Sequence, residues 1–211
     1  MGSQRVSRPA CLLLLVMLGA CSSSSRGRQE PAAPDSALRA ELVRLGVEDQ
    51  AVREGFGSAM ASNDSAFAMR MVRTDSARTT RLRQIVAEHG WPGRALAGDD
   101  GAKAAWLILQ HSPSTEFQQE MLPVLWQAAE RGDIDKASVA MLTDRVLVKE
   151  GKAQRYGSSF GMQNGRLEAH RIEDFAGLDA RRAAVGLPPM QEYVDTLRVV
   201  YRLPVTWPPT P

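Results

Sequence analysis

The chain has 211 residues, of which 24% are charged, and its formal net charge at neutral pH is +2. Arg5 and Arg8, close to the start, account for this whole excess, so the rest of the chain is electrically neutral. A neutral total argues against a nucleic acid or another polyanion as the partner.

The first 21 residues predict export and lipidation. Arg5 and Arg8 precede an apolar run, 10–18, that is too short to anchor a chain across a bilayer. Leu18-Gly19-Ala20-Cys21 follows and resembles a bacterial lipobox, in which the cysteine thiol receives a diacylglycerol and the chain is cut just before it. We therefore expect a signal peptide over 1–20 and a lipid on Cys21. An ordinary cleaved signal peptide and an uncleaved anchor are the alternatives.

The expected lipid anchor places the protein on the bacterial membrane. In a host with two membranes we expect the periplasmic face of the outer membrane, because Ser22 follows the cysteine, as in known outer-membrane lipoproteins. Cys11 leaves with the signal peptide and Cys21 is acylated, so no thiol remains for a disulfide, a metal or a nucleophile. Residues 21–34 are rich in serine and proline and predict a flexible tether.

Residues 35–200 predict a single, mainly α-helical domain. Apolar spacing and capping residues predict helices over 36–45, 48–61, 65–89, 101–111, 115–131, 136–150 and 189–200. Gly46 is expected to end the first helix, and Pro123 to kink the fifth. The helix 101–111 carries Trp106 and is apolar on nearly all sides, which is typical of a helix at the centre of a domain.

One segment breaks the helical pattern. Gln154–Met162 and Arg166–Ile172 flank Asn164-Gly165, a dipeptide typical of a two-residue hairpin turn. We therefore expect one small β-hairpin near residues 154–172. Residues 201–211 contain four prolines, which argues against a helix there and predicts a proline-rich tail.

Several short segments together resemble an uncharacterised bacterial family, domain of unknown function 6624, from about Leu38 to Val194. These segments are Glu48-Asp49-Gln50 with Arg53, His89-Gly90-Trp91-Pro92, Trp106 with Gln110-His111, Phe117-Gln118, Thr143–Leu147, Gly151-Lys152 with Gln154–Gly157, and Arg181-Arg182 with Val185–Pro188. The chain departs from the family pattern at Ser112-Pro113 and at Ser158-Ser159. The resemblance implies a fold and a shared polar patch, but it implies no reaction.

Asp144 is the residue whose position suggests chemistry most strongly. On a helical wheel it falls in the apolar stripe of its helix, so its carboxylate must find a partner or accept a raised pKa. Arg145 and Gln154 are near it in sequence, and His111 ends the helix expected at the centre. Two interpretations follow: a buried aspartate that caps a loop or pairs with an arginine, or a polar pocket in which Asp144 orients His111 for acid–base catalysis.

The other polar residues singled out by the sequence also have two interpretations each. In the first expected strand Gln154 and Tyr156 share a face, as they would in an ordinary edge strand. Gln118 follows Thr115 by three residues, as in a helix capping box. We expect Asp144, His111, Gln154 and Tyr156 to lie around one polar site. The catalytic candidates are His111 and Asp144, and the ligand-binding candidates are Gln118, Arg145, Gln154 and Tyr156.

Two other patterns are rejected. Gly157–Gly161 matches the GxSxG motif of serine hydrolases, but a hairpin follows it rather than a helix. The three histidines lack metal-ligand spacing, so we expect no metal and no cofactor.

Asp49 and Arg53 have helical i,i+4 spacing and are expected to form a surface ion pair.

The sequence therefore favours a non-catalytic binding or scaffold module on the bacterial envelope. Its partner would be another envelope protein or a small molecule, in addition to the membrane that holds the lipid. No complete set of nucleophile and base, and no metal set, can be assembled from the sequence. The alternative is a hydrolase-like enzyme for small molecules that uses His111 and Asp144.

Substitution of the expected lipidated cysteine provides the first test. Because no other thiol lies at the cleavage site, Cys21→Ala should abolish acylation and leave an unprocessed or soluble product. The measurement is the intact mass of the membrane fraction. A mature wild-type protein that begins elsewhere and carries no lipid mass would contradict the assignment.

Overall fold

The computed structural model describes residues 33–55, 59, 62 and 64–208. The expected signal peptide, Cys21 and most of the tether lie outside these residues, as do several residues of the helix expected over 48–61. Within the described part, none of the helices combines the length and the apolar composition needed to cross a bilayer.

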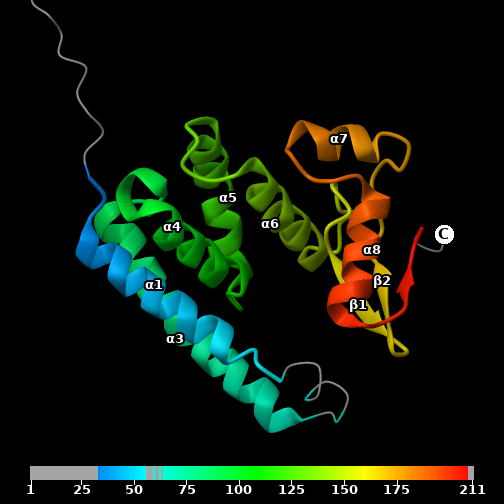
Figure 1. The fold of residues 1–211 in the computed structure, drawn as a ribbon, viewed down its shortest axis with the longest axis horizontal. Coiled ribbons are helices and arrows are strands. Elements are labelled where there is room, and N and C mark those ends of the chain that lie inside the picture. The colour runs from blue at the N-terminus through cyan, green and yellow to red at the C-terminus, as the bar shows by residue number, and fades with distance from the viewer. Residues whose placement is uncertain (1–32, 56–58, 60–61, 63, 209–211) are drawn as a thin grey trace, which may run out of the picture. The chain divides into compact units, whose positions relative to one another are not determined.

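The described domain is mainly α-helical with a small sheet, which confirms the predicted fold class (Figure 1). Its elements in chain order are α1 (Ser36–Ala51), α3 (Ser65–His89), α4 (Arg94–Gln110), α5 (Thr115–Glu130), α6 (Lys136–Lys149), β1 (Phe160–Gln163), β2 (Arg166–Ala169), α7 (Leu178–Ala184), α8 (Met190–Tyr201) and β3 (Val205–Thr206).

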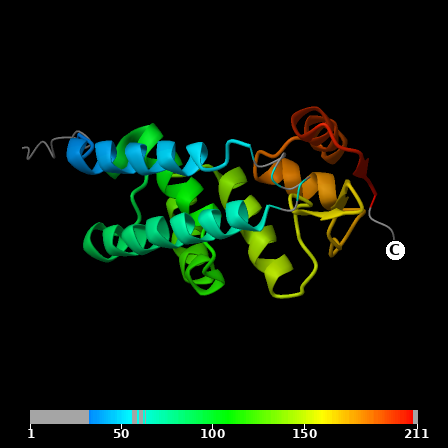
Figure 2. The same cartoon turned by 90° about the horizontal axis from the view of Figure 1, so that it is seen from below.

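Five of the described helices, α1 and α3 to α6, share one hydrophobic core. Each contributes a fully buried leucine, and these are Leu42, Leu82, Leu109, Leu125 and Leu142. The helices α1 and α3 run alongside each other, and α1 packs most extensively against α4 (Figures 1 and 2). The apolar stripes read from the sequence therefore correspond to the packed faces of these helices.

A second hydrophobic core forms where α7 and α8 pack with the sheet. It contains Leu167 of β2, Leu178 of α7, Val194 of α8 and Val205 of β3. The strands have the order β1-β2-β3, with β1 and β2 antiparallel and β3 parallel to β2. Both cores belong to the same compact unit of the chain, so side chains that lie between them can form one site.

The hairpin turn is where the sequence places it, but the strands are shorter. Asn164 and Gly165 have φ angles of 48° and 75°, the positive values that a tight two-residue turn requires. The strands cover only four residues each, and Gln154 makes a single isolated bridge with Ile172. Residues 155–159 are a loop, because their backbone groups bond to buried side chains rather than to a neighbouring strand.

The segment expected as a proline-rich tail contributes to the described domain. Tyr201 is the last residue of α8, and β3 extends the sheet by pairing with β2. Val205 is buried, which explains why this part of the chain is held against the second core.

One expected helix boundary is wrong for a packing reason. Gly46 does not end α1, which continues to Ala51; a Cβ at Gly46 would lie 2.7 Å from the Cβ of Ala104, so this glycine permits close approach of α4. In α4 the backbone leaves helical geometry at Gly98, where φ is 69°, so the helix expected over 101–111 corresponds to the part of α4 after this break. Pro123 lies inside α5. The short helix α7 was not expected from the sequence.

The contact between Gly46 and Ala104 predicts a coupling between the two positions. Gly46→Ala should gain about 1 kcal/mol of helix propensity but lose about 1–3 kcal/mol to overpacking, so we expect a net loss of stability. Adding Ala104→Gly removes the methyl group that clashes, and the double variant should be more stable than the sum of the single changes implies. Urea denaturation of all four proteins measures this coupling, and additivity within about 0.5 kcal/mol would contradict it.

Candidate functional site

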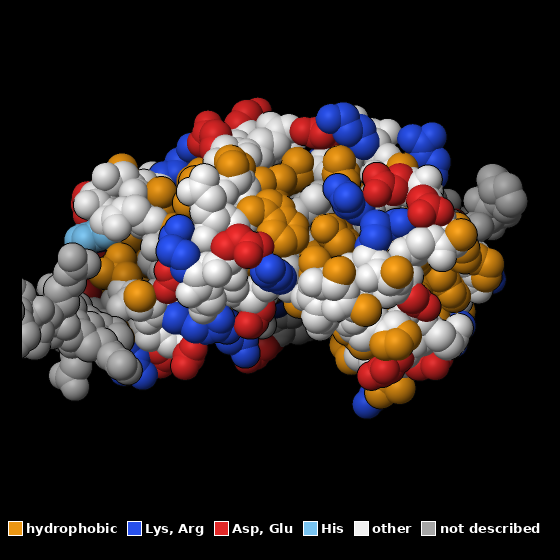
Figure 3. Space-filling model, turned by 90° about the horizontal axis from the view of Figure 1, so that it is seen from above, with side chains coloured by type: hydrophobic (Ala, Val, Ile, Leu, Met, Phe, Trp, Pro, Cys, Tyr) orange, Lys and Arg blue, Asp and Glu red, His pale blue; other side chains and the backbone are white. Residues whose placement is uncertain are grey.

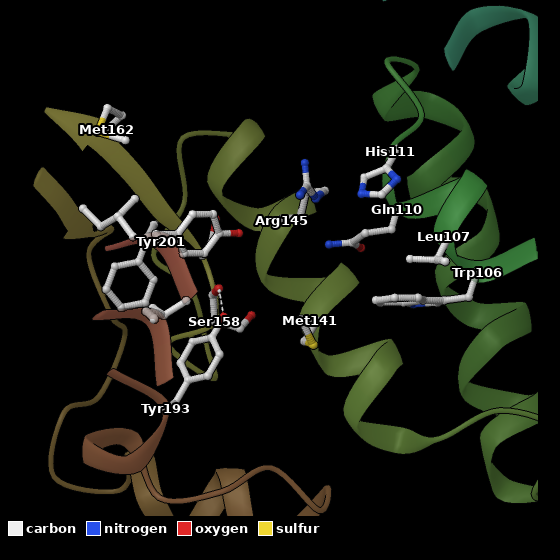
Figure 4. Close-up of a pocket in the computed structure, with 14 residues that line it drawn as sticks. Trp106, Leu107, Gln110, His111, Met141, Arg145, Ser158, Met162, Tyr193 and Tyr201 are labelled. Carbon is white, nitrogen blue, oxygen red and sulfur yellow. Dashed lines mark hydrogen bonds between the residues drawn. The ribbon is translucent and has the colours of Figure 1, made fainter. Parts of the chain in front are cut away.

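A cleft lies between the helical core and the sheet, with α4 and α6 on one side and β1, β2 and α8 on the other (Figure 4). Its volume is about 480 Å³, and the residues that line it are Trp106, Leu107, Gln110, His111, Met141, Arg145, Ser158, Ser159, Phe160, Met162, Leu167, Tyr193, Leu197 and Tyr201. The helix expected at the centre of the domain turns Leu109 into the core and Trp106 toward this cleft. No aspartate or glutamate is found among these lining residues.

Among the residues that line the cleft, Arg145 is the one whose side chain carries a permanent charge. Its Nε is buried without a hydrogen-bond partner, and the guanidinium has no carboxylate partner among the residues that the structure describes. Burial lowers the pKa of Arg145, and the positive charge of Arg53 lowers it further. The cation is therefore left without a counter-ion by the part of the fold that is described.

Gln110 and His111, at the end of α4, lie beside Arg145. Figure 4 shows both side chains directed toward the guanidinium from the facing helix. Gln110 is buried, and its Oε1 has no hydrogen-bond partner. The cleft thus brings together an unpaired donor, an unpaired acceptor and an imidazole.

His111 is held by a carboxylate that the sequence assigned to the surface. Its Nδ1 lies 2.8 Å from Oδ2 of Asp49, which is fully buried. Burial alone would raise the pKa of Asp49, but the hydrogen bond from His111 and the charges of His111 and Arg53 lower it. The expected surface ion pair of Asp49 with Arg53 is therefore a buried one, with a separation of 2.9 Å.

The charges around Asp49 compensate one another. Arg53 also bonds both carboxylate oxygens of Asp75 at 3.0 and 2.9 Å, and Arg78 bonds Asp75 at 2.7 Å. The two carboxylates of this cluster are balanced by its two guanidiniums, and the cluster joins α1 and α3 to the end of α4. The compensation matters because it leaves none of these carboxylates for Arg145.

Asp144 does not orient His111. Its carboxylate accepts hydrogen bonds from the backbone N–H groups of Arg155, Tyr156 and Ser158 at 2.7–2.9 Å, and from the Ser158 hydroxyl at 2.8 Å. The side chain is fully buried, so all its lone pairs are used within this loop. The loop-capping interpretation fits this geometry, and the expected bond to His111 does not form.

Gln154 and Tyr156 also support the loop rather than line the cleft. The Gln154 amide donates to the carbonyls of Ser159 and His170 and accepts from the Ser159 N–H at 2.8 Å. Tyr156 is buried, and burial raises the pKa of its phenol. The expected meeting of Asp144, His111, Gln154 and Tyr156 around one site therefore does not occur, because only His111 of the four lines the cleft.

Gln118 has a different role from the expected capping box. Ser114, not Thr115, caps α5, and the buried Gln118 amide donates to the carbonyl of Leu109 at 2.9 Å. Lys149 donates to the Gln118 Oε1 at 2.9 Å. Gln118 therefore supports the end of α4, behind the residues that face the cleft.

Among the sequence candidates, His111 and Arg145 line the cleft. Sequence reasoning gave no role to Gln110 or to Asp49 as the partner of His111. Gln110 could have been found as a polar residue inside a nearly apolar helix, whereas the pairing of Asp49 with His111 spans 62 positions and depends on the tertiary structure.

The chain matches the sequence profile of a family of unknown function, DUF6624, over residues 34–206. The chain belongs to this family. Neither a curated protein nor a solved structure matches it. The DUF6624 match spans both hydrophobic cores and every residue that lines the cleft.

The charged surface of the DUF6624 domain is mixed. Figure 3 shows positive and negative side chains interspersed on one face, with hydrophobic side chains between them. Two arginines of α3 follow the same pattern, because Arg81 pairs with Glu41 and Arg83 with Glu120. Across the described residues, no group of three or more potential ligands is placed to hold a metal ion.

Replacement of Asp144 tests its structural role. Asp144→Asn keeps the shape but places an amide group among N–H donors, so it should cost about 3 kcal/mol, the range for losing bonds to a buried charged group. The matched control is Asp99→Asn, whose carboxylate is 88% exposed and should contribute less than about 0.5 kcal/mol. Urea denaturation measures both, and equal losses would show that Asp144 does not hold the loop.

Proposed function

We propose that this DUF6624 domain is a non-catalytic module that binds a small molecule in the cleft, and that a lipid on Cys21 holds it on the bacterial envelope. The observation that carries the proposal is the unpaired Nε of Arg145 beside the unpaired Oε1 of Gln110. Buried polar atoms without partners destabilise a fold, and a ligand would supply the missing partners.

The size and lining of the cleft support a small molecule rather than a protein segment. A volume of about 480 Å³ falls in the range of roughly 300–1,000 Å³ that is usual for small-molecule sites. Such sites are mostly apolar with a few converging polar groups, and here the polar groups converge at Arg145 while aromatic and aliphatic side chains line the rest.

The lipobox Leu18-Gly19-Ala20-Cys21 supports the envelope location. With the chain anchored in this way, the cleft would bind molecules outside the cytoplasm, at the membrane that holds the lipid. For a bacterium with two membranes we infer the periplasmic face of the outer membrane, because of Ser22.

An enzyme is the second candidate, and one observation favours it. The 2.8 Å hydrogen bond from the Nδ1 of His111 to Asp49 fixes the ring at the edge of the cleft, as a carboxylate partner does for a general base. The hydroxyl of Ser158 donates to Asp144 at 2.8 Å rather than to His111. His111 would therefore activate water or accept a proton from the bound molecule.

Filling the cleft tests the binding function. Met141 lines the cleft, so Met141→Trp should exclude a ligand, whereas Met69→Trp makes the same change on α3 at a position that is 67% exposed. Each protein is incubated with the small-molecule fraction of a bacterial extract and examined by native mass spectrometry. We expect a molecule that the wild type and Met69→Trp retain and that Met141→Trp loses.

Retention of every bound molecule by a folded Met141→Trp protein, or no retention by the wild type, would contradict the proposal. The same spectra separate the two candidate functions. Conversion of the retained molecule to a product over time by the wild type, but not by His111→Gln, would favour the enzyme.

A further inference from the structure

We propose that the ligand of the cleft is an organic carboxylate with an N–H donor beside the carboxylate and an apolar body, as in an N-acyl amino acid. This inference rests on the proposed function of the cleft and adds the chemical class of its ligand. Three parts of the cleft wall carry it, one for each part of the molecule.

Arg145 recognises the carboxylate. A guanidinium presents N–H donors in a planar fork that matches a carboxylate, and its Nε here is buried with no partner. The lining contains no acidic side chain, and the nearby carboxylates of Asp49 and Asp75 are already paired with Arg53 and Arg78. An anionic ligand would therefore compensate the charge of Arg145, whereas a neutral ligand would leave this cation without a counter-ion.

Gln110 recognises the donor. Its Oε1 is an acceptor that is buried without a partner, and its side chain faces Arg145 across the cleft (Figure 4). A second anionic oxygen at this point would leave the acceptor unsatisfied, whereas an N–H would satisfy it. The donor on the ligand must be close to the carboxylate, because Gln110 and Arg145 line the same end of the cleft.

The remaining walls suit an apolar body. The aromatic rings of Trp106 and Phe160 line the cleft with Met141, and Met162 and Leu197 line it from the sheet and α8. Burying an aliphatic or aromatic group against such side chains contributes roughly 25 cal/mol per Å² of apolar surface. A bare anion such as acetate would leave this surface in contact with water.

Four compounds, each lacking at most one feature, test the assignment with the full-length protein. They are N-acetyl-phenylalanine, its uncharged amide, 3-phenylpropionate without the N–H donor, and N-acetylglycine without the apolar body. We expect N-acetyl-phenylalanine to bind the wild type at least about tenfold more tightly than each of the other three, as measured by calorimetric titration.

In Arg145→Gln the ratio of the affinities for N-acetyl-phenylalanine and for its amide should fall to about one, while the affinity for the amide changes little. The matched control is Arg155→Gln, since Arg155 is exposed and pairs with Glu173 outside the cleft. An amide that binds the wild type as tightly as the acid would overturn the anion assignment and leave small-molecule binding intact. An unchanged ratio in Arg145→Gln, or no binding of any of the four compounds, would also overturn it, while the cleft-filling experiment decides the proposed function separately.

Discussion

The carboxylate of Asp144 joins the two parts of the domain. It lies on α6, which belongs to the helical core, and it holds the backbone of residues 155–158, which lead into the sheet. The next residue along α6 is Arg145, and successive side chains on a helix point about 100° apart. The same helix can therefore hold the loop with one residue and face the cleft with the next. The cleft depends on this arrangement, because its two walls come from the parts that Asp144 joins.

The domain contains a second fully buried carboxylate, and its surroundings lead to a different role. Four hydrogen bonds from one loop surround Asp144, whereas Asp49 lies among Arg53, Arg78 and the ring of His111. Neutral N–H groups stabilise a charge without being able to titrate, so Asp144 acts as a fixed part of the structure. Asp49 instead accepts from Nδ1 of His111 at 2.8 Å and therefore fixes which nitrogen of the ring remains free to face the cleft.

The local parts of this fold could be predicted from the sequence, and the parts that depend on distant contacts could not. The stripe through Leu82 and Ile85 and the turn at Asn164-Gly165 follow from neighbouring residues, and the structure has them as predicted. Gly46 reads as a helix end, but its small size serves the approach of Ala104 from another helix, which no local pattern contains. The predicted pairing of Asp144 with His111 is wrong for the same reason. The sequence suggests a carboxylate–imidazole pair, but Asp144 bonds to the loop backbone and His111 bonds to Asp49.

A comparison of Arg145 with Arg182, neither of which has a carboxylate partner among the described residues, shows why the cleft points to a ligand. Arg182 is fully buried, but it donates to the carbonyls of Pro188 and Tyr156 at 2.7 and 2.6 Å, and its guanidinium lies 5.0 Å from the centre of the Tyr193 ring. Its Nη2 has no hydrogen-bond partner, but these contacts with the backbone and the ring partly offset the desolvation of the cation. Arg145 has no such contacts among the described residues, and it opens onto a cavity rather than onto packed backbone. A cation that has no carboxylate partner in the described fold and that lines a cleft would gain a counter-ion from an anionic ligand bound there, and this distinguishes Arg145 from an arginine that the backbone satisfies.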